Sequence, residues 1–225
     1  MPDLLTFQYH KQGPVVTAYS DNLRGKQVMP GQSEYPKYLW AESHVPQGAR
    51  VLDIGCNSGQ VLRQLRTRKG AHGAGVDIDP SHIEWAKNNN ASGILFYHLA
   101  GEFVDREFGR NWFDVVLMLD VIEHVPSLRP FLRAARHVLK PGGKLVVTVP
   151  YAQGFAGYPY LFGRDVQGAR TNPQHRRVFT WERLETTMRT MGFETIEHTE
   201  IEKEPYGVFY TCGAFEKEAA RAYVP

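Results

Sequence analysis

Three side chains that can bind a metal ion or move a proton lie close together in LDVIEHV, residues 119–125. Asp120 and Glu123 stand three positions apart, and His124 follows directly. One turn of chain could bring all three to a single point. Carboxylate and imidazole groups together suit Mg²⁺, Mn²⁺ or another divalent ion, and a histidine can equally deprotonate an attacking hydroxyl group. The segment therefore indicates a divalent-metal site or a general base.

A glycine-containing turn, VLDIGCNSG at residues 51–59, is a second candidate site. Gly55 and Gly59 let the backbone approach a ligand, and a helix expected after Gly59 points free N–H groups at it. The spacing is not the G-x-G-x-x-G of dinucleotide-binding folds. Asp53 precedes the turn, and a carboxylate there suits a ligand with an ammonium group better than one with a pyrophosphate.

Asp77 lies at the end of the next apolar run, within GVDID. A carboxylate at this position can accept hydrogen bonds from a ribose diol. It could instead cap the following helix, but Asp79 suits that role better because Pro80 follows it directly. We expect Asp77 to bind a ribose.

The elements that position these residues alternate between strands and helices, which predicts a parallel sheet flanked by helices. A weak helical pattern covers 34–44. Apolar periodicity and cap residues predict helices after Gly59, from Asp79 to about Asn90, after Ser127, and from Thr180 to near Gly192, the last with Phe179 and Leu184 as a hydrophobic staple. The segment KPGG (140–143) is expected to stop the third of these helices. The predicted strands are 50–54, 75–78, 94–99, 113–119, 144–149, 193–201 and 208–215, the last two antiparallel.

Composition bounds the class of protein. The chain has 225 residues, is 42% hydrophobic and carries a formal charge of +2, which fits one globular domain and argues against bulk electrostatic binding of nucleic acid. It lacks an apolar run long enough for a membrane span and a visible signal-peptide core. Two cysteines are too few for a disulfide framework. We expect a cytoplasmic enzyme or binding domain.

The motifs together resemble the class I methyltransferases that use S-adenosylmethionine. VLDIGCNSG, GVDID, FDVVLMLDVIEHV and LKPGGKLVVTVP match four segments of that family in the same order. The resemblance implies an α/β, Rossmann-like fold with helices on both faces of a seven-stranded, mostly parallel sheet of order 3-2-1-4-5-7-6, strand 7 antiparallel. It also implies a set of cofactor-binding residues: Asp53, Gly55, Asn57 and Gly59 around the methionine part, Asp77 at the ribose, Ile78 and Glu102 near the adenine, and Asp120. Asn57 replaces a glycine of the family, which asparagine can do because it tolerates left-handed backbone; the alternative is a decayed, inactive site.

The segment NPQHRRVFTWE (172–182) is similar to part of ubiquinone-pathway O-methyltransferases and of small-RNA 2′-O-methyltransferases. That resemblance implies that Asp120, Glu123, His124 and His175 bind a divalent ion, although Asp120 stands where those enzymes carry glutamate. Two alternatives stay open. His124 or His175 could be a metal-free catalytic base, or these residues could only support the loop.

Two further segments are interpreted by position. Residues 1–45 are expected to form a lid or cap segment of the single domain 1–225, with Tyr35, Lys37 and Trp40 near the cofactor. Residues 151–178 are expected to form a substrate-side insertion loop, rich in aromatic side chains that could contact a ring-shaped acceptor. Four arginines of this loop could bind phosphate, carboxylate or nucleic-acid backbone: Arg164, Arg170, Arg176 and Arg177.

The predicted function is methyl transfer from S-adenosylmethionine to an oxygen, less readily a nitrogen, of a small-molecule acceptor. The alternatives are a metal-dependent RNA 2′-O-methyltransferase, a nicotinamide-dependent oxidoreductase and a non-catalytic nucleotide-binding protein. Balanced charge argues against RNA, and the missing G-x-G-x-x-G argues against nicotinamide. The acceptor and the oligomeric state stay open.

Overall fold

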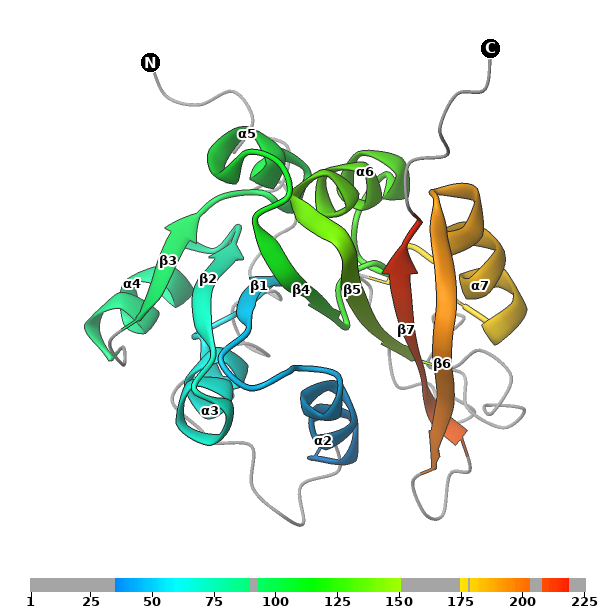
Figure 1. Cartoon of the computed structure of the whole chain (residues 1–225), viewed down its shortest axis with the longest axis horizontal. Helices are drawn as coiled ribbons and strands as arrows, with labels where there is room; N and C mark the ends of the chain where they lie inside the picture. Colours follow the sequence, from blue (N-terminus) through cyan, green and yellow to red (C-terminus); the bar gives the residue numbers. More distant parts are fainter. Residues whose placement is uncertain (1–34, 90–92, 151–174, 178, 203–207, 219–225) are drawn as a thin grey trace, which may run out of the picture.

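Seven strands form one sheet in the order β3-β2-β1-β4-β5-β7-β6. The computed structural model describes residues 35–89, 93–150, 175–177, 179–202 and 208–218. Neighbouring strands are parallel except where β7 pairs with β5 and β6. This confirms the predicted sheet (Figure 1). The strands are β1 Arg50–Ile54, β2 His72–Asp77, β3 Ile94–His98, β4 Phe113–Leu119, β5 Leu139–Pro150, β6 Phe193–Glu202 and β7 Val208–Lys217.

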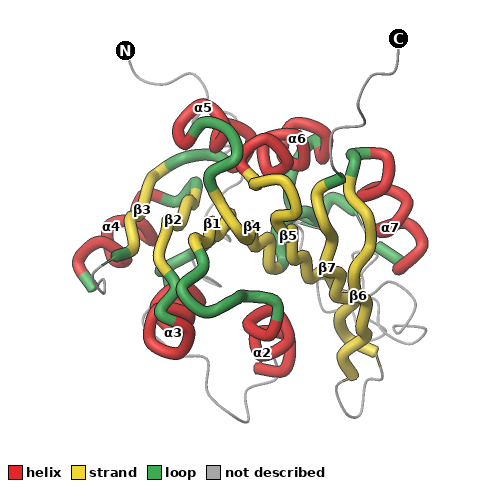
Figure 2. The backbone as a smooth tube through the Cα atoms, viewed as in Figure 1, coloured by secondary structure: helices red, strands yellow, loops and turns green. Residues whose placement is uncertain are grey.

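Helices cover both faces of the sheet, as predicted (Figure 2). Buried residues of α2 (Tyr35–Ser43), α3 (Gln60–Lys69) and α4 (Pro80–Asn88) belong to the hydrophobic cluster on one face. Buried residues of α5 (Val104–Phe108), α6 (Leu128–Val138) and α7 (Trp181–Thr190) belong to the cluster on the other. The sheet is therefore the middle layer of three, and its strand ends are left to form a site.

The central strand β4 explains why its sequence is almost continuously apolar. Val115 and Leu117 pack into one cluster, whereas Val116 and Met118 pack into the other. All four are at most 1% exposed. Successive residues of a strand point to opposite faces, so a strand covered on both sides buries every one of them. Each such side chain contributes about 1.5–3 kcal/mol to folding.

Two helices begin at the residues that the sequence predicts. Asp79 caps α4, where its Oδ1 accepts a hydrogen bond from the Ser81 N–H at 2.8 Å. Thr180 caps α7, and its Oγ1 accepts from the Arg183 N–H at 3.3 Å. Phe179 and Leu184 are both buried at the start of α7, at the positions of the predicted hydrophobic staple.

Three local predictions need correction, and two short elements were not predicted. The strand expected at 75–78 is β2, which begins at His72 and ends at Asp77. Strand β5 begins at Leu139, so KPGG lies inside this strand instead of before it; Leu139 pairs with Phe113 and Lys144 with Val115, which makes KPGG a bulged insertion. Ser127 is the N-cap residue of α6, but its side chain makes no cap hydrogen bond. The turn at Gly101–Phe103 and the short helix α5 were not predicted, because five residues are too few to show helical periodicity.

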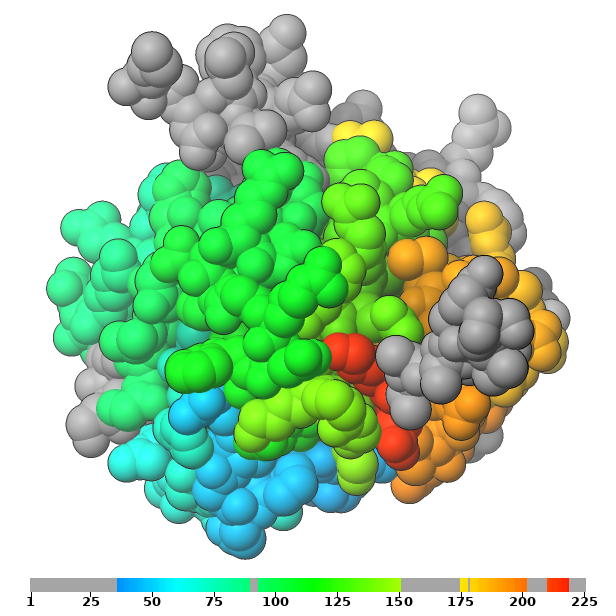
Figure 3. Space-filling view, turned by 45° about the horizontal axis from the view of Figure 1, so that its top comes forward, coloured from blue at the N-terminus to red at the C-terminus, as the bar shows by residue number. Residues whose placement is uncertain are grey.

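The insertion of β7 between β5 and β6 is also visible on the surface, where residues of β7 (red) lie between the green middle of the chain and the orange of β6 (Figure 3). Of the predicted insertion loop 151–178, only 175–177 lie within the described residues, and the segment 1–45 is described from residue 35 onward. Among the residues that the structure describes, no helix is both long and apolar enough to cross a membrane.

Candidate functional site

The glycine turn after β1 needs its two glycines. Gly55 and Gly59 have φ angles of 78° and 75°, in the left-handed region. A Cβ atom on Gly55 would lie 2.6 Å from Cγ2 of Val121, and one on Gly59 would lie 2.4 Å from the ring of Phe96. Both the backbone angle and the lack of space therefore exclude a side chain. The contact with Val121 also brings this turn against the loop that follows β4.

Asn57 stands where the family carries glycine, and it supports the turn. Its φ is 49°, a left-handed value that asparagine tolerates. Its Oδ1 accepts a hydrogen bond from the Ser58 N–H at 2.6 Å. Its own N–H donates to Asp77 Oδ2 at 2.9 Å and so ties the turn to the end of β2. The local geometry is that of an ordered turn.

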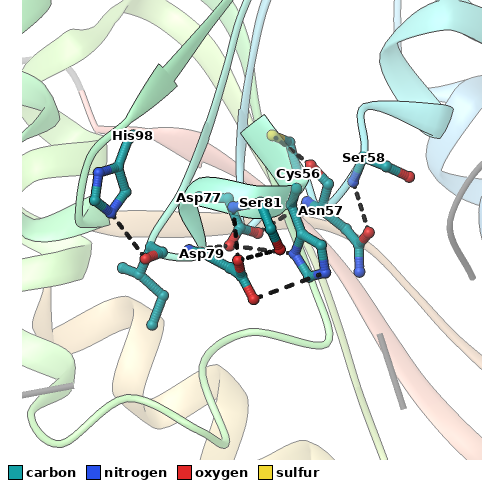
Figure 4. A network of polar contacts seen from close by, with 9 residues as sticks. Cys56, Asn57, Ser58, Asp77, Asp79, Ser81 and His98 are labelled. Carbon is teal, nitrogen blue, oxygen red and sulfur yellow. Dashed lines mark hydrogen bonds and ion pairs between the residues drawn. The ribbon is translucent and has the colours of Figure 1, made fainter. Parts of the chain in front are cut away.

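The Asp77 carboxylate is held at the centre of this network (Figure 4). Besides the Asn57 N–H, it accepts the Asp79 N–H on Oδ1 at 2.8 Å. A carboxylate offers about four acceptor positions, so capacity for a diol is left after two backbone bonds. His82 is buried nearby, with Nδ1 3.7 Å from Asp77 Oδ1. The ribose-binding role predicted for Asp77 fits this geometry and stays a prediction.

Asp53 is a buried carboxyl group beside the turn, only 3% exposed. Burial and, to a smaller extent, the charge of Asp77 together raise the pKa of Asp53 to about 7. A cationic ligand group would relieve both effects by favouring the ionised form. The position is therefore suited to an ammonium-bearing ligand.

The predicted adenine side is built from Ile78 and the turn after β3. Ile78 is 38% exposed, although it is a large apolar residue, and its carbonyl oxygen lies 3.0 Å from His98 Nε2. An added Cβ on Gly101 would lie 2.5 Å from Ile54, so the turn that carries Glu102 packs directly on β1. The structure places Ile78 and Glu102 after neighbouring strands, and their contact with a cofactor remains untested.

Asp120, at the end of β4, forms a partly buried ion pair with Lys37 of α2. Asp120 has a left-handed φ of 57°. Its Oδ1 accepts a hydrogen bond from Thr148 Oγ1 at 2.7 Å. Lys37 is 2% exposed, and its ammonium also lies 4.2 Å from the ring centre of Tyr210. The carboxylate predicted to bind cofactor or metal is thus already paired with a cation of the chain.

Three of the four predicted metal ligands form a cluster. Ligand atoms of Glu123, His124 and His175 all lie within 4.8 Å of one another, and Asp120 is not part of this group. The imidazole rings of His124 and His175 meet edge to face, with centroids 4.8 Å apart. Glu123 is 1% exposed, and neither of its carboxylate oxygens has a hydrogen-bond partner in the described part of the chain.

Burial dominates the electrostatics of this cluster. It raises the pKa of Glu123 well above its ordinary value, and the neighbouring charge of Asp120 acts in the same direction. Burial and, to a smaller extent, the neighbouring His124 together lower the pKa of His175 to about 4. With a pKa of about 4, His175 is neutral near pH 7. A neutral imidazole is the form that binds metal ions.

The sequence predicted the residues of the site but not the residues with which they interact. Lys37 was placed near the cofactor, but its ion pair with Asp120 spans 83 positions. A signal existed: Lys37, Ala41 and Val45 recur every fourth residue, which puts Lys37 on the buried face of α2. Of the four candidate anion-binding arginines, Arg164 and Arg170 lie outside the described residues, and the Arg177 guanidinium contacts backbone carbonyls.

Comparisons with known proteins agree with the fold and the motifs. The family model of a methyltransferase domain matches residues 32–198. A ubiquinone biosynthesis O-methyltransferase of Azorhizobium caulinodans is 32% identical over 160 residues, which cover 67% of this chain and 61% of that protein. The enzyme of the same name from Bradyrhizobium is 40% identical over 101 residues, 45% of this chain and 40% of the relative. The matches thus span about two fifths to three fifths of the length of these curated relatives.

A solved structure extends the agreement to the fold. Burkholderia thailandensis 1,6-didemethyltoxoflavin-N1-methyltransferase, with bound S-adenosylhomocysteine, has a TM-score of 0.70 and 18% identity; the match covers 96% of this chain and 88% of that one. A [4+2]-cyclase shares the fold as well, with a TM-score of 0.64, 16% identity and 87% of both chains covered, so fold alone does not define the reaction. The sequence match does define the family: the chain belongs to the class I S-adenosylmethionine-dependent methyltransferases.

Proposed function

We propose that the protein transfers the methyl group of S-adenosylmethionine to an oxygen atom of a small-molecule acceptor. The observation that carries the proposal is the turn of Gly55, Asn57 and Gly59, which is hydrogen-bonded to Asp77 through the Asn57 N–H. The Asp77 carboxylate can accept further hydrogen bonds besides those from Asn57 and Asp79. The residues fit the cofactor, because Asp53 and Asp77 suit its ammonium and ribose groups and Ile78 offers an apolar surface. The names of the ubiquinone biosynthesis relatives support oxygen as the acceptor atom.

The chain's own residues then have two main tasks. The cofactor supplies a methyl group that is already electrophilic, so the protein must orient the acceptor and accept its proton. His124 is the preferred base, because its ring is part-exposed and it lies in the loop that the Gly55 turn contacts through Val121. His175 is a weak base near pH 7, since burial lowers its pKa to about 4. Lys37 neutralises Asp120 and holds it in place.

The cluster of Glu123, His124 and His175 also fits a divalent ion. A buried carboxyl group without a hydrogen-bond partner, next to a neutral imidazole, is the donor set that Mg²⁺ or Mn²⁺ would satisfy. Such an ion would lower the pKa of an acceptor hydroxyl group. With Asp120 paired to Lys37, the proposed ligands are these three residues, and Asp120 would join them only by releasing Lys37.

The test is a transfer assay with isotope-labelled S-adenosylmethionine and a panel of phenols, hydroxy acids, amines and single-stranded RNA, with and without EDTA. We expect labelled O-methyl product from a hydroxylated small molecule and a signal in the methoxy region of the NMR spectrum. N-methyl product alone, or transfer only to RNA, would contradict the proposal. Loss of activity with EDTA and recovery with Mn²⁺ would support the metal; indifference to EDTA would leave His124 as a metal-free base.

A further inference from the structure

The loop after β4 carries Glu123 and His124 but does little to fix its own shape. The described backbone N–H groups of the loop that donate are Asp120 N–H, to Thr148 O at 2.9 Å, and His124 N–H, to Val121 O at 3.0 Å. Ile122 and Val125 are nonetheless buried, at 0% and 5% exposure. Buried backbone carbonyl groups need donors, because leaving them without a partner costs as much as a lost hydrogen bond. The loop requires a donor from elsewhere in the chain.

Arg177 supplies that donor. Its Nη1 donates to the carbonyl oxygen of Ile122 at 2.8 Å and also to that of Val125, and its Nη2 donates to that of Pro126 at 3.1 Å. One planar guanidinium group therefore bridges three carbonyls around the loop. A lysine ammonium is a point charge without this fork and could not hold all three in the same way.

The same segment binds the loop a second time, through its backbone. The Arg176 N–H donates to the Glu123 carbonyl oxygen at 2.8 Å. These bonds hold residues 176 and 177 against the loop and carry the preceding residue, His175, to an edge-to-face contact with His124. The candidate substrate-binding residue Arg177 thus links the two segments that contribute to the cluster.

We infer that Arg177 is a positioning residue that assembles Glu123, His124 and His175. The inference rests on the proposed role of this cluster in the reaction, but the assembly itself can be measured without activity. Centroids 4.8 Å apart place ring protons of the two histidines close enough for a nuclear Overhauser cross-peak. Wild-type protein is expected to show this cross-peak in NMR spectra with labelled histidine.

The experiment compares Arg177→Lys and Arg177→Met with Arg176→Met as the matched control, since Arg176 contacts the loop through its backbone. Both Arg177 variants should lose the His124–His175 cross-peak and keep S-adenosylhomocysteine affinity, which reports an intact fold. The control should retain the cross-peak. Persistence of the cross-peak in either Arg177 variant, or its equal loss in the control, would overturn the inference. Arg177→Lys is the gentler change and applies if Arg177→Met does not fold.

A second readout connects positioning to ligand binding. If the cluster binds Mn²⁺, the Kd for Mn²⁺ should rise roughly 10- to 100-fold in Arg177→Lys, as expected when a residue that positions the metal ligands is altered. In Arg176→Met the Kd should stay within about twofold of the wild-type value. An unchanged Kd in Arg177→Lys would count against the inference. Absence of Mn²⁺ binding in the wild type would contradict only the proposed metal, because the cross-peak tests the role of Arg177 separately.

Discussion

Lys37 and Asp120 lie 83 positions apart in the chain and form an ion pair at the carboxyl edge of the sheet. The pair joins the helix α2 to the end of β4, where the loop with Glu123 and His124 begins. Since Lys37 is 2% exposed, its ammonium has given up hydration, and its contacts with Asp120 and the Tyr210 ring compensate for that loss. The N-terminal helix is therefore part of the site as well as part of the core.

Removing one partner of this ion pair should destabilise the protein more than removing both partners. Lys37→Met leaves Asp120 partly buried without its cation, and we expect a loss of about 3 kcal/mol in the free energy of unfolding. The double variant Lys37→Met/Asp120→Asn should recover a substantial part of that loss, because no unpaired charge remains. Urea unfolding of the two single variants and the double variant measures the coupling. Additive losses would show that the ion pair does not link the two elements.

The Asp77 carboxylate should govern cofactor affinity. Asp77→Asn keeps the size of the side chain but loses the charge and presents amide hydrogens to the backbone donors of Asn57 and Asp79. We expect S-adenosylhomocysteine binding to weaken by about 1–3 kcal/mol, measured by calorimetry. Asp79→Asn is the matched control, since asparagine also caps helices well. Equal losses in both variants would remove the special role of Asp77.

Asp53 should make the ligand-free protein less stable as the pH rises. The folded protein holds the Asp53 proton up to a pKa of about 7, whereas the unfolded chain releases it near pH ~4. Between these values the folded state binds more protons, so the free energy of unfolding falls as pH rises through this window and levels off above it. Asp53→Asn lacks this contribution, so its stability relative to the wild type should increase from pH 4 to pH 7. Thermal unfolding across this range tests the sign; a constant difference would contradict it.

Cofactor binding should respond to the same carboxyl group in the opposite sense. The ionised form of Asp53 suits an ammonium ligand, so wild-type affinity for S-adenosylhomocysteine should rise between about pH 6 and 7.5. Asp53→Asn should bind more weakly and with little pH dependence in that range. A parallel rise in both proteins would assign the effect to another group.

Substitution of Gly55 by alanine should destabilise the protein much more than the same substitution at Gly70, a glycine with a similar backbone angle. Gly55 and Gly70 both have left-handed φ values, 78° and 62°. Only at Gly55 would an added Cβ meet Val121, whereas nothing lies within 4 Å of one at Gly70. Gly70→Ala should therefore cost about 1 kcal/mol of conformational strain, and Gly55→Ala more than this with loss of cofactor binding. Similar unfolding free energies for the two variants would show that the turn can move away from the loop.

Local signals and the family resemblance predicted most of the fold. Asp79 followed by Pro80, and Thr180 between Phe179 and Leu184, encode their helix starts within a few residues, so the sequence alone is enough there. The continuous apolar run of β4 requires cover on both faces. The helix α6 ends at Val138, just before KPGG, as predicted. The start of β5 was wrong, because turn chemistry is the same whether a turn ends an element or bulges within one.

The site was predictable in its residue types but not in its pairings. The motif around Asp120, Glu123 and His124 could be found by spacing, but which side chains pair depends on contacts across the fold. Asp120 turned toward Lys37 and Thr148, leaving Glu123 with the histidines. Arg177 reaches Ile122 across 55 positions. Such contacts are set by the packing of whole elements, which local patterns do not contain.

The most direct test of the account is a calorimetric titration of the wild-type protein with S-adenosylhomocysteine, with NAD as the comparison ligand. The account predicts saturable binding of S-adenosylhomocysteine at one site per chain and no measurable heat with NAD. Binding of NAD, or no binding of S-adenosylhomocysteine at millimolar concentration, would contradict the claim that the turn of Gly55 to Gly59 and the Asp77 carboxylate form an adenosyl-amino-acid site.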